Sequence, residues 1–113
     1  IVRHGRYSPP TMGIELDDGV NQRLTAMLNV KGVAVLRVKP GSPAAAVGLQ
    51  GANMTRKGIV PGDIITAVDG KPVDSVGKFA ARLDEFKAGD RIRLTLLRQG
   101  RSVEVFVTLQ QGE

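Results

Sequence analysis

Two runs of alternating apolar and polar residues near the end of the sequence predict a β-hairpin. The apolar positions are Ile92, Leu94 and Leu96 in the first run and Val103, Val105 and Val107 in the second. The dipeptide Gln99-Gly100 between them suits a tight reversal. The resulting register sets Arg93 opposite Phe106 on the outer face, where a cation–π contact would shelter the exposed ring.

Apolar residues recur at steps of three and four from Ser75 onward, which predicts a helix. The recurring residues are Val76, Phe79, Ala80, Leu83 and Phe86. Gly89 suits its C-terminal end, because glycine adopts the left-handed conformation that often ends a helix. A shorter helix is expected after Ser42, which suits an N-cap before Pro43, with Gly48 at its end.

The first third of the chain predicts two strands separated by a short helix. The strands are expected over residues 12–16 and 32–38, the second being rich in β-branched residues. Residues 21–30 favour the helix, with Asn21 available as a cap. Its apolar face would hold Leu24, Met27 and Leu28.

The middle of the chain predicts a loop and then a strand. Residues 50–58 show no periodicity and contain two adjacent cations, so they are expected to form an exposed loop. A strand is expected over residues 63–68. It ends in a reversal at Asp69-Gly70, a dipeptide that accepts positive φ.

These elements predict one mainly β domain of the α+β class. A chain of 113 residues is large enough for a single modest core. Five to six short strands and two helices fit a small, partly open β-barrel capped by the helices. Residues 1–10 are polar, basic and end in two prolines, so we expect a linker from an upstream domain, followed by the folded domain over residues 11–113.

Composition narrows the classes of partner. The net charge is +5, but the basic residues are scattered and aromatics make up only 4%, so no stacking platform supports nucleic-acid binding. No apolar run is long enough to span a bilayer, and direct membrane insertion is not expected. The sequence contains no cysteine, which removes disulfides and thiolate metal sites.

The sequence offers no catalytic constellation. His4 is the single histidine and lies in the expected linker, and no serine stands in the GDSGG context of a trypsin-like nucleophile. The acidic pairs Asp17-Asp18 and Asp84-Glu85 lack metal-ligand spacing and are expected to be solvated. We therefore expect no enzymatic activity, no metal and no cofactor.

Gly13 stands between two large apolar residues at the start of the first predicted strand. A glycine there costs conformational entropy and marks a bend or a close approach to bare backbone. If Met12, Gly13 and Ile14 turn their amides toward one point, they form an anion-binding nest. The alternative is that Met12, Ile14 and Leu16 are only core residues of an alternating strand.

Four segments carry a resemblance to a known family. They are TMGI (11–14), GSPAAAVGL (41–49), PGDIITAVDGKPV (61–73) and SVGKFAARL (75–83). In this order they resemble the carboxylate-binding loop, central stretch and groove helix of PDZ domains, in particular those of HtrA-type (Deg) trypsin-like serine proteases. The opening IVRHGRYSPPTMGI resembles that family's join from protease to PDZ domain. One departure is QGANMTRKGIV (50–60), since many relatives run almost directly from AVGL into PGD.

The resemblance implies a peptide-binding groove between the first strand and the helix from Ser75. The implied carboxylate-binding loop is Thr11, Met12, Gly13 and Ile14, and the implied groove residues are Glu15, Leu16, Val76, Ala80 and Leu83. Phe79 would point into the core. Arg6 is a candidate to balance the carboxylate, with a solvated linker cation as the alternative. The apolar residues of the helix have the alternative of being a plain core stripe.

The implied function is capture of C-termini or extended hydrophobic segments of substrates or regulators by β-strand addition. The alternative is an assembly or regulatory docking domain that contacts the protease domain or a neighbouring subunit. The implied partners are peptides or unfolded proteins, the parent protease domain, and further copies assembled through that domain. The implied setting is protein quality control in an extracytoplasmic compartment, periplasmic or membrane-anchored facing the periplasm.

Overall fold

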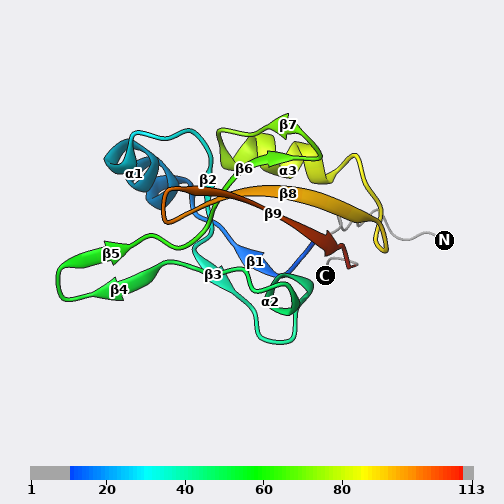
Figure 1. The fold of residues 1–113 in the computed structure, drawn as a ribbon, viewed down its shortest axis with the longest axis horizontal. Helices are drawn as coiled ribbons and strands as arrows, with labels where there is room; N and C mark the ends of the chain where they lie inside the picture. Colours follow the sequence, from blue (N-terminus) through cyan, green and yellow to red (C-terminus); the bar gives the residue numbers. More distant parts are fainter. Residues whose placement is uncertain (1–10, 111–113) are drawn as a thin grey trace, which may run out of the picture.

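The largest sheet has five antiparallel strands and crosses the middle of the molecule (Figure 1). The computed structural model describes residues 11–110. The strands of this sheet are β2 (Val33–Ala34), β6 (Ile64–Val68), β7 (Lys71–Pro72), β8 (Arg91–Arg98) and β9 (Arg101–Thr108). Their order is β2-β6-β8-β9, and β7 pairs with β6.

The β8–β9 hairpin has the predicted register. Its inward-facing pairs are Ile92↔Val107, Leu94↔Val105 and Leu96↔Val103. Gln99 and Gly100 both have positive φ, 51° and 79°. Two such residues form the turn whose twist matches that of the flanking strands. The hairpin is therefore confirmed in its strands, turn and pairing.

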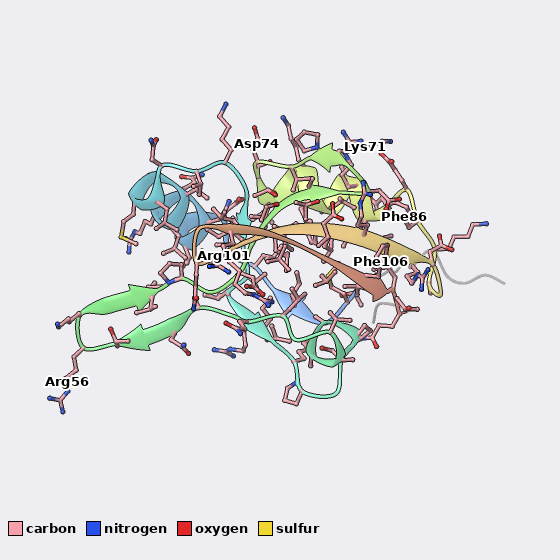
Figure 2. All side chains as sticks on the ribbon, in the orientation of Figure 1. Arg56, Lys71, Asp74, Phe86, Arg101 and Phe106 are labelled. Atoms are coloured by element: carbon pink, nitrogen blue, oxygen red, sulfur yellow. The ribbon has the colours of Figure 1, made fainter. Side chains whose placement is uncertain are left out.

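The cation–π contact predicted for Arg93 is made by Arg91 instead. Arg93 does pair with Phe106 across the strands, but the Arg91 guanidinium carbon lies 5.1 Å from the Phe106 ring centroid. Phe106 is 54% exposed on the outer face (Figure 2). A diagonal neighbour is within reach of a long side chain, and Arg93 Nε lies 3.9 Å from Oε2 of Glu104. The directly opposed arginine is thus paired at long distance with an acidic neighbour, and the diagonal arginine lies over the ring.

Two small antiparallel pairs complete the β structure of residues 11–110. β1 (Ile14–Glu15) pairs with β3 (Arg37–Val38), and β4 (Asn53–Thr55) pairs with β5 (Gly58–Val60). The strand predicted over residues 32–38 is divided between β2 and β3. Val35 N–H donates to Asp63 O, whereas Leu36 N–H donates to Glu15 O, each at 3.0 Å. The chain changes its partner strand between these two residues, which ends β2.

The segment 50–58, predicted to be a loop, instead contains most of the β4–β5 hairpin, which protrudes from the body (Figure 1). Its tip is exposed as expected. The Thr55 hydroxyl donates to Gly58 O at 2.8 Å and accepts from Lys57 N–H at 3.2 Å, which closes the turn. Ile59 packs against a hydrophobic cluster and anchors the hairpin base. The loop prediction was wrong because neither the turn bonds nor this anchor leaves a periodic pattern.

α1 (Asp18–Leu28) begins earlier than predicted and has a different cap. Asp17 is the N-cap, and its side chain accepts from Val20 N–H at 2.9 Å. Asn21, predicted as the cap, lies within the helix and is 4% exposed. Its Oδ1 accepts from Ala34 N–H at 2.7 Å. Asn21 therefore ties α1 to β2 instead of starting the helix.

The apolar face predicted for α1 is only partly correct. Leu24 is 2% exposed, but Met27 is 63% and Leu28 39% exposed. The helix packs on the body mainly around Leu24, because its end extends past the sheet (Figure 1). Two large apolar side chains therefore remain on the surface.

α2 (Pro43–Ala46) has the predicted N-cap, and α3 (Val76–Leu83) begins directly after Ser75, where the helical pattern was predicted to start. Ser42 Oγ accepts from Ala45 N–H at 3.2 Å, and Ser75 Oγ accepts from Lys78 N–H at 3.1 Å. α3 ends at Leu83, earlier than the predicted stop at Gly89. Gly89 has φ +96° and donates its N–H to Leu109 O at 2.8 Å, so it serves the connection into β8.

The main hydrophobic cluster joins both ends of the described chain and includes Met12, Phe79, Leu94 and Leu109. A second cluster centres on Leu24, Ala34 and Ile64. The predicted α+β, mainly β class with a partly open sheet is confirmed, although residues 11–110 form nine short strands and three helices. Within that range no helix has the length and apolar character needed to cross a membrane.

Candidate peptide-binding groove

The loop before β1 is fastened at both ends by backbone hydrogen bonds. Thr11 N–H donates to Gln110 O and Gln110 N–H donates to Thr11 O, each at 2.8 Å. Met12 O accepts from Ala44 N–H at 3.0 Å, and the Met12 side chain is fully buried. Met12 therefore anchors the loop in the core beside α2.

Gly13 needs to be glycine for two reasons. Its φ of +84° lies in the left-handed region, and a Cβ added to it would overlap Ser42 Cβ. The expectation that its conformation requires glycine is confirmed. The neighbour that occupies the side-chain space is Ser42, the N-cap of α2, so glycine is required here even without a ligand.

β1 has one edge that no described strand covers. Gly13 O accepts from Lys39 N–H at 2.8 Å, and Glu15 O accepts from Leu36 N–H at 3.0 Å. Alternate residues of a strand bond to the same side, so the backbone groups of Ile14 face away from β3. Among residues 11–110, β1 pairs only with β3. The N–H and C=O of Ile14 are thus available to an added strand.

α3 places the predicted helical groove residues on one side, since positions 76, 80 and 83 share a helix face. Val76 is partly buried and Ala80 is exposed, whereas Leu83 is 8% exposed. Phe79 is 2% exposed in the main cluster, in agreement with its predicted core position.

The predicted residues of β1 and α3 meet at the main hydrophobic cluster. Ile14, Leu16 and Val76 pack against this cluster, and Met12 and Leu83 belong to it. The loop, β1 and α3 thus pack on one hydrophobic core, and the peptide groove between β1 and α3 stays a prediction. Arg6 lies outside the described residues.

The comparison with known families decides the identity of the domain. A PDZ domain family matches residues 10–109, almost the whole chain. The chain belongs to the PDZ domain family. The resemblance predicted from the TMGI and PGDIITAVDGKPV segments is confirmed.

Curated relatives of this PDZ domain are proteases. It is 36% identical over 113 residues to Protease Do-like 1, chloroplastic, of Arabidopsis thaliana. This alignment covers 97% of the chain and 25% of the relative. It is 31% identical over 115 residues to the periplasmic serine endoprotease DegP of Escherichia coli K12, covering 99% of the chain and 22% of the relative. The PDZ domain therefore spans about a quarter of the length of these relatives.

Two solved protease structures share this fold. A serine endoprotease from Yersinia pestis aligns with a TM-score of 0.67 at 28% identity, covering 98% of the PDZ domain and 32% of that chain. The HtrA-type protease AlgW with decapeptide aligns with a TM-score of 0.71 at 21% identity. This alignment covers 97% of the PDZ domain and 31% of the AlgW chain. The second likeness is one of fold alone.

Lys39 is a further residue beside the loop before β1, which the sequence alone did not single out. Lys39 follows β3, and its N–H bond to Gly13 O sets it opposite the loop, with the residue exposed. The sequence held no local signal for this position, because it depends on the pairing of β3 with β1. The neighbouring Glu15 and Arg37 form an ion pair of 3.8 Å that is largely exposed and therefore weak.

Two perturbed ionisable groups of the PDZ domain lie away from these residues. The hydrogen bond to buried Asp63 raises the pKa of the Arg98 guanidinium above its usual value. A hydrogen bond from Arg82, together with the charge of Lys71, lowers the pKa of the exposed Glu85 carboxyl. Both pairs are structural, and neither belongs to the predicted groove.

Proposed function

We propose that this PDZ domain is the peptide-binding module of an HtrA-type serine protease and captures C-termini or extended hydrophobic segments of substrates or regulators. The observation that carries the proposal is the uncovered edge of β1 directly after the Gly13 loop. Such an edge pairs readily with an extended peptide, in the mode known as β-strand addition.

The bound peptide lies antiparallel to β1, and Ile14 C=O accepts a hydrogen bond from its backbone. Its terminal carboxylate accepts hydrogen bonds from the amides of residues 12–14. Gly13 N–H already contacts Thr11 Oγ1 at 3.3 Å, a long bond that an anion outcompetes. The side chains of the peptide pack against Val76, Ala80 and Leu83.

Catalysis in this proposal belongs to the protease domain of the parent protein, and the PDZ domain binds without hydrolysing. The names of the relatives, chloroplastic and periplasmic, support an organellar or extracytoplasmic location. The same names support a parent protease domain as the intramolecular partner, with assembly into oligomers through that domain.

Calorimetric titration with C-terminal peptides tests the proposal. Decapeptides ending in Leu, Val or Phe are compared as free acids and as amides. We expect the amides to bind about tenfold or more weakly, because hydrogen bonds to a charged group contribute roughly 1.5–3 kcal/mol. Equal affinity of acid and amide would argue against the carboxylate loop, and absence of binding by either would favour the docking role.

A pair of tryptophan variants on α3 tests the position of the groove. Ala80 and Ala81 are both exposed neighbours, but only Ala80 lies on the face of Val76 and Leu83. Ala80→Trp should weaken the free-acid peptides about tenfold or more by filling the space for the peptide. Ala81→Trp is the matched control and should leave affinity unchanged.

A further inference from the structure

An apolar cavity lies where the end of α1, the end of β5 and the β8–β9 turn meet. Its volume is about 390 Å³. This size falls within the range of roughly 300–1,000 Å³ typical of ligand sites. The aliphatic residues of its wall are Leu28, Val30, Val60, Pro61, Ile64 and Leu97. None of the predicted groove residues lines this cavity, so it is a separate feature.

The cavity is the open side of the second hydrophobic cluster. Ile64 belongs to that cluster, and Val30 and Leu97 pack against it, so the cavity floor is a rigid part of the core. Apolar surface continues outside the cavity, because Leu28 is 39% and Val60 47% exposed. Exposed apolar surface that adjoins a cavity is typical of an interaction site.

The chain segments around this cavity are strongly basic. Residues 22–31, 50–63 and 97–103 contain six cations and one carboxylate, that of Asp63. The cations are Arg23, Lys31, Arg56, Lys57, Arg98 and Arg101. Arg56 lies at the tip of the β4–β5 hairpin, and Arg101 lies at the β8–β9 turn (Figure 2).

The one carboxylate in the cavity wall is already neutralised. Asp63 is fully buried, and Arg98 Nε and Nη2 each donate to it at 2.8 Å. Arg98 Nη2 also donates to Gly48 O at 3.2 Å, which fixes the guanidinium in place. The charges of the lining residues therefore cancel, and the basic surround of the apolar floor consists of the exposed Lys31 and Arg101, which follow the lining residues Val30 and Gly100 in the chain.

We propose that this cavity is a second binding site, for an acidic protein segment that carries aliphatic side chains beside its carboxylates. The apolar side chains enter the cavity, and the carboxylates face the surrounding cations. A small molecule would leave the exposed parts of Leu28 and Val60 uncovered. A nucleic acid would find no aromatic side chain among the lining residues on which to stack a base.

The end of the β4–β5 hairpin supplies one wall of this site, and the two cations of the hairpin lie at its protruding tip. Val60 and Pro61 line the cavity, and Arg56 and Lys57 form the turn. This hairpin lies in the segment QGANMTRKGIV, which departs from the pattern of many PDZ relatives. The site is independent of the proposed groove.

Nuclear magnetic resonance titration of the 113-residue chain tests the site. The probe is the peptide ELDLEIDL, acetylated and amidated so that it has no free carboxylate for the loop before β1. We expect amide shifts at Leu28, Val60 and Leu97, with β1 and α3 unchanged. The peptides KLKLKIKL and ESDSESDS, blocked in the same way, should bind about tenfold more weakly, since each lacks one half of the complementarity.

Variants locate the contact and provide the control. Val60→Asp and Arg101→Glu should each weaken ELDLEIDL about fivefold or more, with affinity falling as salt rises. Lys87→Glu makes the same charge change on an exposed residue away from the cavity and should have no effect. Thermal melts confirm that each variant is folded. All three variants should still bind free-acid peptides at the groove. Failure of the second-site proposal is therefore distinguishable from failure of the proposed function.

Three outcomes would overturn the proposal. The first is a set of shifts confined to β1 and α3. The second is equal binding of the acidic and basic peptides. The third is tighter binding of single-stranded oligothymidine or of phosphatidylglycerol vesicles that is lost in Val60→Asp and Arg101→Glu, which would assign the basic surround to a different class of anion.

Discussion

At the scale of single residues, Gly13 has the most constrained environment of the candidate site. Its positive φ and its contact with Ser42 act together, and the two contributions can be separated by mutation. Gly100 has a similar φ of +79°, but a Cβ added there would meet nothing within 4 Å. Gly100 is therefore a control for conformation without the close contact.

Gly13→Ala should destabilise the domain more than Gly100→Ala. The left-handed conformation alone costs an alanine about 1–2 kcal/mol, and only Gly13→Ala adds a clash with Ser42 Cβ. Urea unfolding measures the free energy of unfolding of both variants. Adding Ser42→Gly should recover part of the loss, since glycine is a tolerable N-cap. Equal losses in the two single variants would show that Ser42 gives way and the contact is unimportant.

Asp63 is the residue whose removal should cost most among the acidic side chains of the described chain. It is fully buried, accepts from Gln50 N–H at 2.9 Å and receives two bonds from Arg98. Asp63→Ala should lower the free energy of unfolding by about 3 kcal/mol, because the arginine loses its charge partner and an amide its acceptor. The exposed Asp84→Ala is the control and should change it by less than about 0.5 kcal/mol. Similar values for both would contradict the structural role of Asp63.

The resemblance to PDZ domains matches Val76 to the helix position that faces the ligand residue two places before the C-terminus, so Val76 should set the preference of the groove there. It is the first residue of α3, is partly buried and has no polar atom. A ligand hydroxyl placed against it would lose its water partner without replacement. Screening a C-terminal peptide library should therefore enrich apolar residues at that position. Enrichment of Ser or Thr there would show that Val76 does not line the groove.

At the scale of elements, the two hairpins should differ in local stability. β8 and β9 lie in the large sheet, with Ile92, Leu94, Leu96 and Val107 fully buried. β4 and β5 form a two-stranded sheet of their own, anchored by Ile59. A small exposed sheet opens without disturbing the core.

Amide hydrogen exchange measures this difference. Amides of residues 53–60 should exchange at least about tenfold faster than those of residues 92–96, because they open locally instead of through global unfolding. Addition of ELDLEIDL should slow exchange near Val60 if the second site is occupied. Equal protection of the two hairpins in the free domain would mean that β4–β5 is a cooperative part of the core.

At the scale of the whole molecule, the chain is one PDZ domain with a continuous core from Met12 to Leu109. Residues 11–110 contain no group of three or more His, Cys, Asp or Glu side chains placed to hold a metal ion. Its relatives are longer proteases, of which it spans about a quarter. The proposed function assigns to this domain the binding half of a larger function.

The isolated chain should keep its melting temperature in EDTA and should not hydrolyse casein. The only histidine of the sequence is His4, so no second histidine is available as a general base. Thermal melts with and without chelator, and a fluorescent casein assay, measure the two properties. Proteolysis that persists through repeated purification, or a melting temperature that falls in EDTA, would contradict the expectation.

Features that depend on near neighbours in the chain could be predicted from the amino-acid sequence alone. Alternation and a two-residue turn fixed the register of β8–β9, and Ser42 and Ser75 marked two helix starts. The motifs around Gly13 and Asp63 were sufficient to predict the family. Each of these signals lies within a few residues, where hydrogen-bonding patterns and side-chain periodicity repeat regularly.

Features that depend on distant residues emerged only from the folded arrangement of the elements. Asn21 bonds to Ala34, thirteen positions away, instead of capping α1. Ser42 fills the space beside Gly13, and Arg91 reaches Phe106 while Arg93 turns to Glu104. The exposure of Met27 follows from where the sheet ends. Packing between elements decides which face of an element is covered and which partner a side chain contacts. Local periodicity encodes neither.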